Sequence, residues 1–258
     1  GHKIGVNGTT PSTGYVVKYS EEESGTYTTN EITKTNVGDY TVYYEVSAPN
    51  FTTFRNSGTI SISSATITAV ATNYEGVFDY AGHQIGVNVT TPSTGYVVKY
   101  SEEENGTYSE TEILTTDVGD YTVYYEVSAP NFTTVKGSGT ISISSATITA
   151  SATNYEGVFD YAEHKIGVNV TTPSTGYTIK YSDSENGTYS ETEILKTDVG
   201  DYTVYYEVSA PNFTTVKGSG TISISSATIT AAATNYEGVF DYAGHKIGVN
   251  VTTPSTGY

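Results

Sequence analysis

The sequence predicts an all-β protein made of tandem immunoglobulin-like β-sandwich domains in an extended rod. Three observations predict this fold class. The phrase that begins at His2 returns at His83, His164 and His245, a period of 81 residues, which is too long for common solenoids and suits a small sandwich domain. Short stretches that alternate apolar and polar residues recur in every copy, separated by Gly, Pro and Asn. No stretch shows the 3.6-residue period and the caps of a long helix.

The repetition also defines the expected domains. The chain of 258 residues holds three copies of 81 residues and a further 15 that repeat the beginning. We predict a partial domain at 1–63 that lacks its first strand, complete domains at 64–144 and 145–225, and a partial domain at 226–258 with only the first strands. Because the segment from Ile143 to Ile148 contains neither Gly nor Pro, neighbouring domains are expected to touch.

The second copy shows the expected strands most completely. Its alternating stretches lie at 65–72, 84–90, 96–100, 121–127 and 139–144. The strongest of these places four residues on one face: Tyr121, Val123, Tyr125 and Val127. In the last strand, Ile141 and Ile143 are expected to point inward. A weaker segment covers 107–114.

Breaks and turns are expected between these strands, since Gly, Pro, Asn and Asp favour turn conformations. They lie at 73–76, 91–95, 101–106, 117–120 and 129–132. The loop at 101–106 is acidic and contains an Asn-Gly pair, a strong turn signal.

Composition excludes several classes of function. Acidic residues number 28 against 11 basic ones, a net charge of -17, which argues against binding to nucleic acid or to an anionic membrane surface. The chain has no Cys, and therefore no disulfide, thiolate nucleophile or Cys-based metal site. No window of 18 apolar residues is present, so we expect no membrane insertion in this segment. A Cys-free, acidic chain rich in Thr, Ser and Tyr is typical of an extracellular, cell-surface protein.

Several phrases of each copy resemble the bacterial Ig-like repeats of surface proteins, of the MBG and YDG type. They are Tyr74-Glu75-Gly76, Gly95-Tyr96 with Lys99-Tyr100-Ser101, the strand from Val118 to Tyr124, and Pro130-Asn131-Phe132. Glu75 stands where the family often has Asp, and Phe132 where it often has Tyr. The resemblance implies a β-sandwich stalk or adhesin module without a catalytic site.

The residues themselves offer no catalytic, cofactor or metal site. The four histidines have no second ligand at metal-binding spacing, and we interpret them as solvated residues at strand edges. The acidic loop at 102–104 is expected to be solvated rather than a calcium site, because Ser184 replaces one acid in the next copy. Asp120, Glu75 and Asp79 are expected to bond to local backbone. Lys99 and Asn131 recur in every copy but are not expected to form an isopeptide bond.

Tyrosine is the most prominent residue type, with 25 in the chain. We expect Tyr96, Tyr121 and Tyr125 in the core, and leave Tyr124 and Tyr108 as exposed contacts. The sequence therefore predicts a non-enzymatic spacer or filament whose partners are neighbouring repeats. The alternative is an adhesin whose tyrosine-rich faces contact glycans or host proteins. The partial ends suit a window of a longer array better than subunits that lend a strand to each other.

Overall fold

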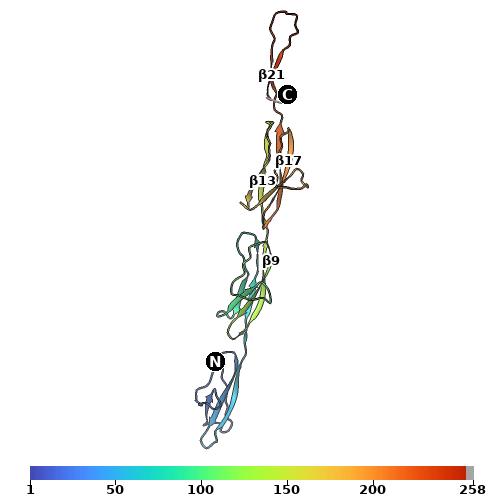
Figure 1. The fold of residues 1–258 in the computed structure, drawn as a ribbon. Helices are drawn as coiled ribbons and strands as arrows, with labels where there is room; N and C mark the ends of the chain where they lie inside the picture. The colour runs from blue at the N-terminus through green and yellow to red at the C-terminus, as the bar shows by residue number, and fades with distance from the viewer. Residues whose placement is uncertain (254–258) are drawn as a thin grey trace. The chain divides into compact units, whose positions relative to one another are not determined.

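The computed structural model describes residues 1–253 as an all-β chain of tandem immunoglobulin-like sandwiches (Figure 1). Contacts divide it into two compact units. The first contains Gly1–Gly76 and Tyr80–Ile143, and the second contains Val77–Asp79 with the chain from Ser144 onward. The predicted domain boundaries after residues 63, 144 and 225 stay predictions, and the last predicted segment, 226–258, extends beyond the described residues.

The third repeat, in the second unit, shows the sandwich in full. Its strands are β12 (Ala146–Thr147), β13 (Thr149–Thr153), β14 (Tyr155–Val158), β15 (Gly167–Thr172), β16 (Thr178–Ser182), β17 (Gly200–Ser209), β18 (Phe213–Thr214) and β19 (Val216–Ser225). One sheet has the order β14-β19-β17-β16, with β14 parallel to β19 and the other pairs antiparallel. β13 pairs with β15, and β12 pairs with β18.

Apolar residues that alternate along these strands form the core of the third repeat. Ile222, Val204 and Val208 are completely buried. They pack with the other core residues, Ile148, Ile166, Tyr181, Tyr206 and Ile224. Burying a side chain of this size contributes about 1.5–3 kcal/mol, so this cluster is the main source of stability of the repeat.

The second repeat has the same arrangement. Its strands are β4 (Ala65–Thr66), β5 (Thr68–Thr72), β6 (Tyr74–Val77), β7 (Gly86–Thr91), β8 (Val97–Ser101), β9 (Gly119–Ser128), β10 (Phe132–Thr133) and β11 (Val135–Ser144). The sheets have the orders β6-β11-β9-β8, β5-β7 and β10-β4. The predicted inner face of β9 is confirmed at Val123, Tyr125 and Val127, which are buried, while Tyr121 is half-buried. Ile141 and Ile143 are also buried, as predicted.

The first and last parts of the described chain contain fewer strands. The first repeat forms one sheet of β1 (Val16–Ser20), β2 (Gly38–Ser47) and β3 (Phe54–Ile62), over a core of Tyr19, Val42 and Ile60. The C-terminal segment pairs β20 (Thr230–Thr234) with β21 (Gly248–Thr253).

Two local predictions were wrong. The segment 73–76 was expected to be a break, but β6 begins at Tyr74 because it pairs with the distant strand β11, and the Asn73 Oδ1 atom accepts a hydrogen bond from the Thr140 N–H at 3.0 Å. The expected strand 65–72 is interrupted at the buried Ile67, where the chain changes partner from β10 to β7.

A glycine in β11 and β19 lets a tyrosine ring lie across the backbone. Tyr206 on β17 is directly opposite Gly218 and is only 5% exposed; a Cβ on Gly218 would lie 2.5 Å from its Cζ atom. In the first repeat Asn56 takes the place of this glycine, and the opposite residue, Tyr44, is only half-buried. The glycine leaves room for this ring, and in the second repeat the Tyr125 hydroxyl also donates to the Ala69 carbonyl on β5, a strand with no counterpart in the three-stranded sheet described for the first repeat.

Candidate functional sites: a charged sheet face, a groove and a joint

Each repeat carries a row of charged side chains across three strands. In the second repeat Lys99 lies opposite Glu126, which lies opposite Lys136, and the Lys136 Nζ atom is 3.4 Å from the Glu126 carboxylate. The matching pairs in the first and third repeats are Arg55–Glu45 at 2.7 Å and Lys217–Glu207 at 3.1 Å. Pairs this exposed contribute about 0–1 kcal/mol each, so the row mainly keeps the face hydrated.

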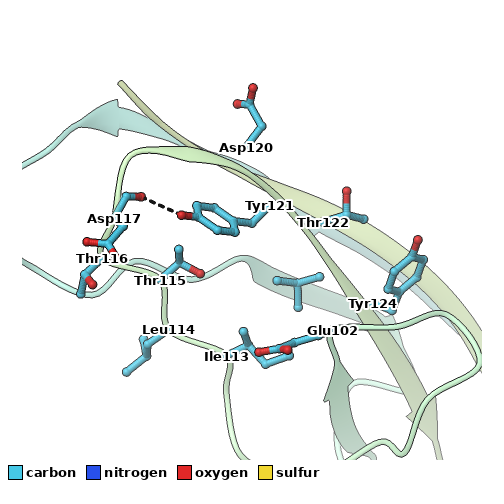
Figure 2. Close-up of a pocket in the computed structure, with 11 residues that line it drawn as sticks. Glu102, Ile113, Leu114, Thr115, Thr116, Asp117, Asp120, Tyr121, Thr122 and Tyr124 are labelled. Atoms are coloured by element: carbon cyan, nitrogen blue, oxygen red, sulfur yellow. Dashed lines mark hydrogen bonds between the residues drawn. The ribbon is translucent and has the colours of Figure 1, made fainter. Parts of the chain in front are cut away.

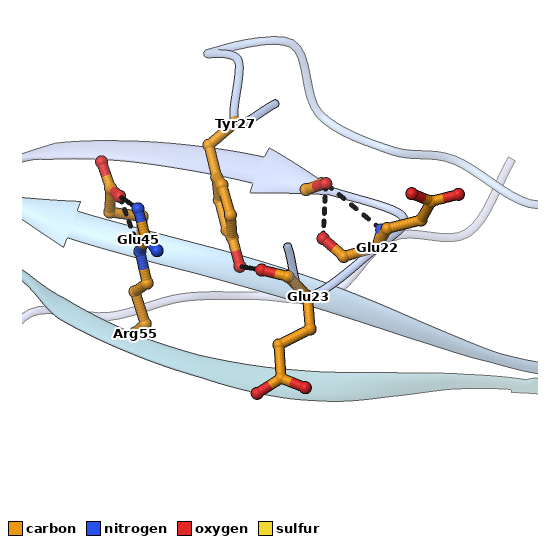
Figure 3. Close-up of polar contacts among 6 residues, drawn as sticks. Glu22, Glu23, Tyr27, Glu45 and Arg55 are labelled. Atoms are coloured by element: carbon orange, nitrogen blue, oxygen red, sulfur yellow. Dashed lines mark hydrogen bonds and ion pairs between the residues drawn. The ribbon is translucent and has the colours of Figure 1, made fainter. Parts of the chain in front are cut away.

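A tyrosine lies beneath the cation at the end of each row. The Lys136 Nζ atom is 4.3 Å from the ring centroid of Tyr108, and the corresponding pairs are Arg55–Tyr27 at 4.8 Å and Lys217–Tyr189 at 4.2 Å. Figure 3 shows that Tyr27 also donates its hydroxyl to the Glu23 carbonyl, at 2.9 Å. Tyr108, which we expected to be an open contact, is instead half-buried and held by Lys136.

The acidic loops are organised by a buried serine. The Ser101 Oγ atom donates to the Glu103 carbonyl at 2.8 Å and accepts from the Glu103 N–H at 3.2 Å, and Ser20 does the same with Glu22 (Figure 3). Within residues 1–253, no three His, Asp or Glu side chains gather as they would around a metal ion. In the same residues no helix is long and apolar enough to cross a membrane.

The prediction of solvated edge residues was wrong for His83 and His164, which are half-buried, whereas His2 and His245 are exposed. The side chain of His164 is only 11% exposed, because its ring stacks on Tyr155 with 3.9 Å between the ring centroids. The His164 Nε2 atom is 3.2 Å from the Tyr155 hydroxyl and 2.9 Å from the Asp160 carboxylate. The same stack recurs at Tyr74–His83 and Tyr236–His245. Sequence spacing alone does not reveal this packing.

An aspartate holds the turn before the third histidine. The Asp160 carboxylate accepts a hydrogen bond from the Ala162 N–H at 2.9 Å, as expected for this position from its counterpart Asp79. This bond and the contact with His164 lower the pKa of Asp160 below its usual value. Tyr161, between them, has a φ of 66°, which is unusual for a bulky residue. The turn is therefore a fixed element rather than a loose loop. Asp120 was expected to bond to local backbone, but its carboxylate instead accepts a hydrogen bond from the Ser142 Oγ atom across the sheet, at 2.5 Å.

The second repeat contains an open groove with a volume of about 610 Å³. It is lined by Glu102 and by residues 113–117 and 120–124 (Figure 2). Tyr121 donates its hydroxyl to the Asp117 carbonyl at 3.2 Å, which fixes the ring along one wall. Tyr124, expected as an exposed contact, is half-buried and lines the same groove. The groove thus joins aromatic rings with carboxylates.

A side chain of the second repeat reaches the first repeat. The Asn131 Oδ1 atom accepts a hydrogen bond from the Val37 N–H at 2.8 Å, and its Nδ2 atom donates to the Asn36 Oδ1 atom at 3.3 Å. Asn131 has a φ of 68°, a left-handed conformation that Asn tolerates well. We call this contact the Asn131 joint. Asn131 was expected in a turn and was not expected to form an isopeptide bond; in the structure its side-chain amide forms these two hydrogen bonds.

A second contact joins parts of two sequence copies within the second unit. The ring of Phe78 meets the ring of Phe213 edge-on, with 5.6 Å between centroids. The Phe78 N–H donates to the Ser144 carbonyl at 2.9 Å. Aromatic pairs of this geometry contribute about 0.5–1.5 kcal/mol beyond their burial. The Phe78–Phe213 pair is therefore a specific contact inside the second unit.

No family model and no curated protein matches the chain. Among solved structures, it is similar to the extracellular cadherin domains 3–6 of protocadherin gamma B2, with 12% identity, a TM-score of 0.33 and coverage of 84% of this chain and 68% of that one. It is also similar to the human desmocollin-1 ectodomain, with 15% identity, a TM-score of 0.27 and coverage of 86% of this chain and 57% of that one. A third similar structure is the insect immune protein hemolin, with 13% identity, a TM-score of 0.33 and coverage of 83% of this chain and 68% of that one. Similarity this distant carries no functional argument.

Proposed function

We propose that the chain is a non-enzymatic structural module of an extracellular, cell-surface repeat protein, in which it acts as a semi-rigid spacer or fibre. The repeated sandwich fold supports this proposal, because the same unit recurs with few changes. The Cys-free acidic composition supports an extracellular location. The resemblance to bacterial Ig-like repeats of the MBG and YDG type is part of the same proposal.

The Asn131 joint carries the proposal. A spacer must resist bending where one repeat follows another, and hydrogen bonds from one side chain to two residues of the preceding repeat restrict that motion. Each bond of this kind contributes about 0.5–1.5 kcal/mol, so the two Asn131 bonds are expected to limit bending at this joint.

The joint can be tested by measuring distances between two spin labels. Because the natural chain has no Cys, the changes Thr41→Cys and Ser138→Cys give unique labels at exposed positions in the first and second repeats. We expect a narrow distance distribution in this labelled protein. Asn131→Gly keeps the left-handed backbone accessible but removes both hydrogen bonds, and we expect it to broaden the distribution.

The matched control is Asn50→Gly in the labelled protein. Asn50 also has a φ of 68° but belongs to the first repeat and takes no part in the joint. This change should leave the distribution narrow. A broad distribution before any change at position 131, or one that Asn131→Gly does not alter, would overturn the spacer proposal.

The alternative is a binding module that contacts glycans or host proteins through tyrosine-rich faces. The groove of the second repeat favours it, since Tyr121 and Tyr124 line that groove together. A glycan array probed with the full chain and with Tyr124→Ala tests this role. Binding that depends on Tyr124 would support it.

A further inference from the structure

The groove of the second repeat lies where the other repeats hold a lysine side chain. In the first repeat, the Lys34 Nζ atom lies 5.2 Å from the ring centroid of Tyr40 and 2.7 Å from the Glu21 carboxylate. The lysine side chain is only 23% exposed there. In the third repeat, Lys196 lies 5.0 Å from the ring centroid of Tyr202. In the first and third repeats, a lysine ammonium group therefore lies over a tyrosine ring at this position of the fold.

The second repeat has Thr115 instead of this lysine. The backbone pairing at this position is the same in all three repeats, because Lys34, Thr115 and Lys196 each form an isolated β-bridge with the histidine of their own repeat. The corresponding ring, Tyr121, and the corresponding carboxylate, Glu102, both line the groove. In the described part of the chain Glu102 has no ion pair, and no cation lies over Tyr121. The shorter side chain thus leaves an aromatic ring and an acid without their cation.

We propose that this groove binds the lysine side chain of a partner polypeptide. The ammonium group would occupy the position that Lys34 Nζ takes in the first repeat, against the face of Tyr121 and within reach of the Glu102 carboxylate. Ile113 and the 62% exposed Leu114 supply apolar surface for the methylene chain. Asp120, also in the lining, and the net charge of -17 favour a basic segment over a neutral or acidic one.

The differences between the repeats support this assignment. The second and third copies differ at only eight of 81 positions. Two of these eight differences, Thr115 against Lys196 and Glu102 against Asp183, fall in the groove. The second copy therefore combines the longer acid with the missing lysine, a combination that neither of the other copies has. The site is independent of the proposed spacer role, because it does not involve Asn131.

The probe is the peptide acetyl-Gly-Lys-Gly-amide, titrated into the full chain with ¹³C-labelled tyrosine and followed by NMR. Tyr121→Phe identifies the Tyr121 ring signals. One exposed cation contact gives weak binding, with a dissociation constant on the order of 1–10 mM. We expect saturable shifts of the Tyr121 ring and no comparable shifts at Tyr40 or Tyr202. The same peptide with norleucine in place of lysine should produce none.

Three variants make the proposal falsifiable. Thr115→Lys restores the residue of the other repeats, so it should fold normally and weaken binding at Tyr121 at least tenfold. Lys34→Thr recreates the second-repeat combination in the first repeat and should make Tyr40 respond to the peptide. Glu102→Gln should weaken binding about two- to fivefold, as expected for an exposed ion pair.

Several results would overturn the proposal. They are the absence of saturable shifts at Tyr121, an equal response to the norleucine peptide, and full binding in Thr115→Lys. Binding of a neutral glycan that Thr115→Lys abolishes would also overturn it, since the groove would then recognise hydroxyl groups rather than an ammonium.

Discussion

Placing a methyl group on Gly218 should expel a tyrosine from the core of the third repeat. The added Cβ of Gly218→Ala would lie 2.5 Å from Cζ and 2.9 Å from Cε1 of Tyr206, and also too close to its hydroxyl. The ring must therefore swing away from the strand. Tyr206 is 5% exposed, and an aromatic side chain buries roughly 150–250 Å². Exposing half of that surface costs about 2–3 kcal/mol at about 25 cal/mol per Å².

Part of this cost is offset, because alanine is better than glycine in a strand by roughly 0.5–1 kcal/mol. We expect a net loss of about 1.5 kcal/mol in the local opening free energy. Hydrogen exchange measured by mass spectrometry reports this as an approximately tenfold faster exchange. The peptides 135–144 and 216–225 have the same sequence, so only the substituted one changes mass. The second repeat then serves as an internal reference in the same sample.

Two further variants separate the clash from the general effect of adding a methyl group. Gly5→Ala places the methyl where no atom lies within 4 Å, and it should not destabilise the protein. In a Tyr206→Ala background, Gly218→Ala should be neutral or stabilising, because the ring that it displaces is gone. Equal exchange rates of the two peptides in Gly218→Ala would refute the reasoning.

Three other changes test the remaining contacts. Tyr155→Phe removes the hydroxyl 3.2 Å from His164 Nε2 and should cost about 0.5–1.5 kcal/mol in thermal unfolding experiments; an unchanged stability would contradict this. Hydrogen bonds lower the pKa of Asp160 in the folded protein. Its contribution to folding stability is therefore complete above the usual aspartate pKa near 4 and is lost as the pH falls through the lower folded value. An NMR titration of its carboxyl carbon should show the lowered pKa, and a normal midpoint would contradict this prediction. Burial raises the pKa of Tyr181, so its contribution to folding stability is complete below about pH 10 and is lost as the pH rises through the raised value. In a titration followed by tyrosinate absorbance, one tyrosine that ionises at high pH should be present in the unchanged protein and missing in Tyr181→Phe.

The strand faces could be predicted because their signal is local. The alternation of Val123, Tyr125 and Val127 is a property of one short segment, and one buried face is sufficient to fix it. β6 gave no such signal. Its four residues, Tyr74–Val77, become a strand only because β11 lies alongside them in the fold, more than 60 residues later in the sequence. Contacts at this range are absent from any pattern that a short window can show.

The candidate sites were harder to predict for the same reason. The sequence shows one histidine in each copy, but the stack of Tyr155 on His164 depends on the turn held by Asp160. Aligning the copies shows that Thr115 stands where the third copy has Lys196, but the alignment does not show that this difference opens a groove. That conclusion depends on two structural facts: the β-bridge that holds Thr115 beside His83, and the groove that both Glu102 and Tyr121 line. Asn131 likewise gains its role from Val37, which is 94 residues away in the sequence.

The two proposals make opposite demands on the repeats, and one set of proteins can separate them. A spacer needs the same joint residue in successive copies, and asparagine stands at positions 50, 131 and 212. Recognition needs a copy that differs, and only the second copy has threonine at the lysine position. If both hold, Asn131→Gly should broaden the label distances and leave binding of the lysine peptide unchanged. Thr115→Lys should weaken that binding at least tenfold and leave the distances narrow. A variant that alters both readouts would mean that the groove and the joint are mechanically coupled, and that the spacer itself responds to what it binds.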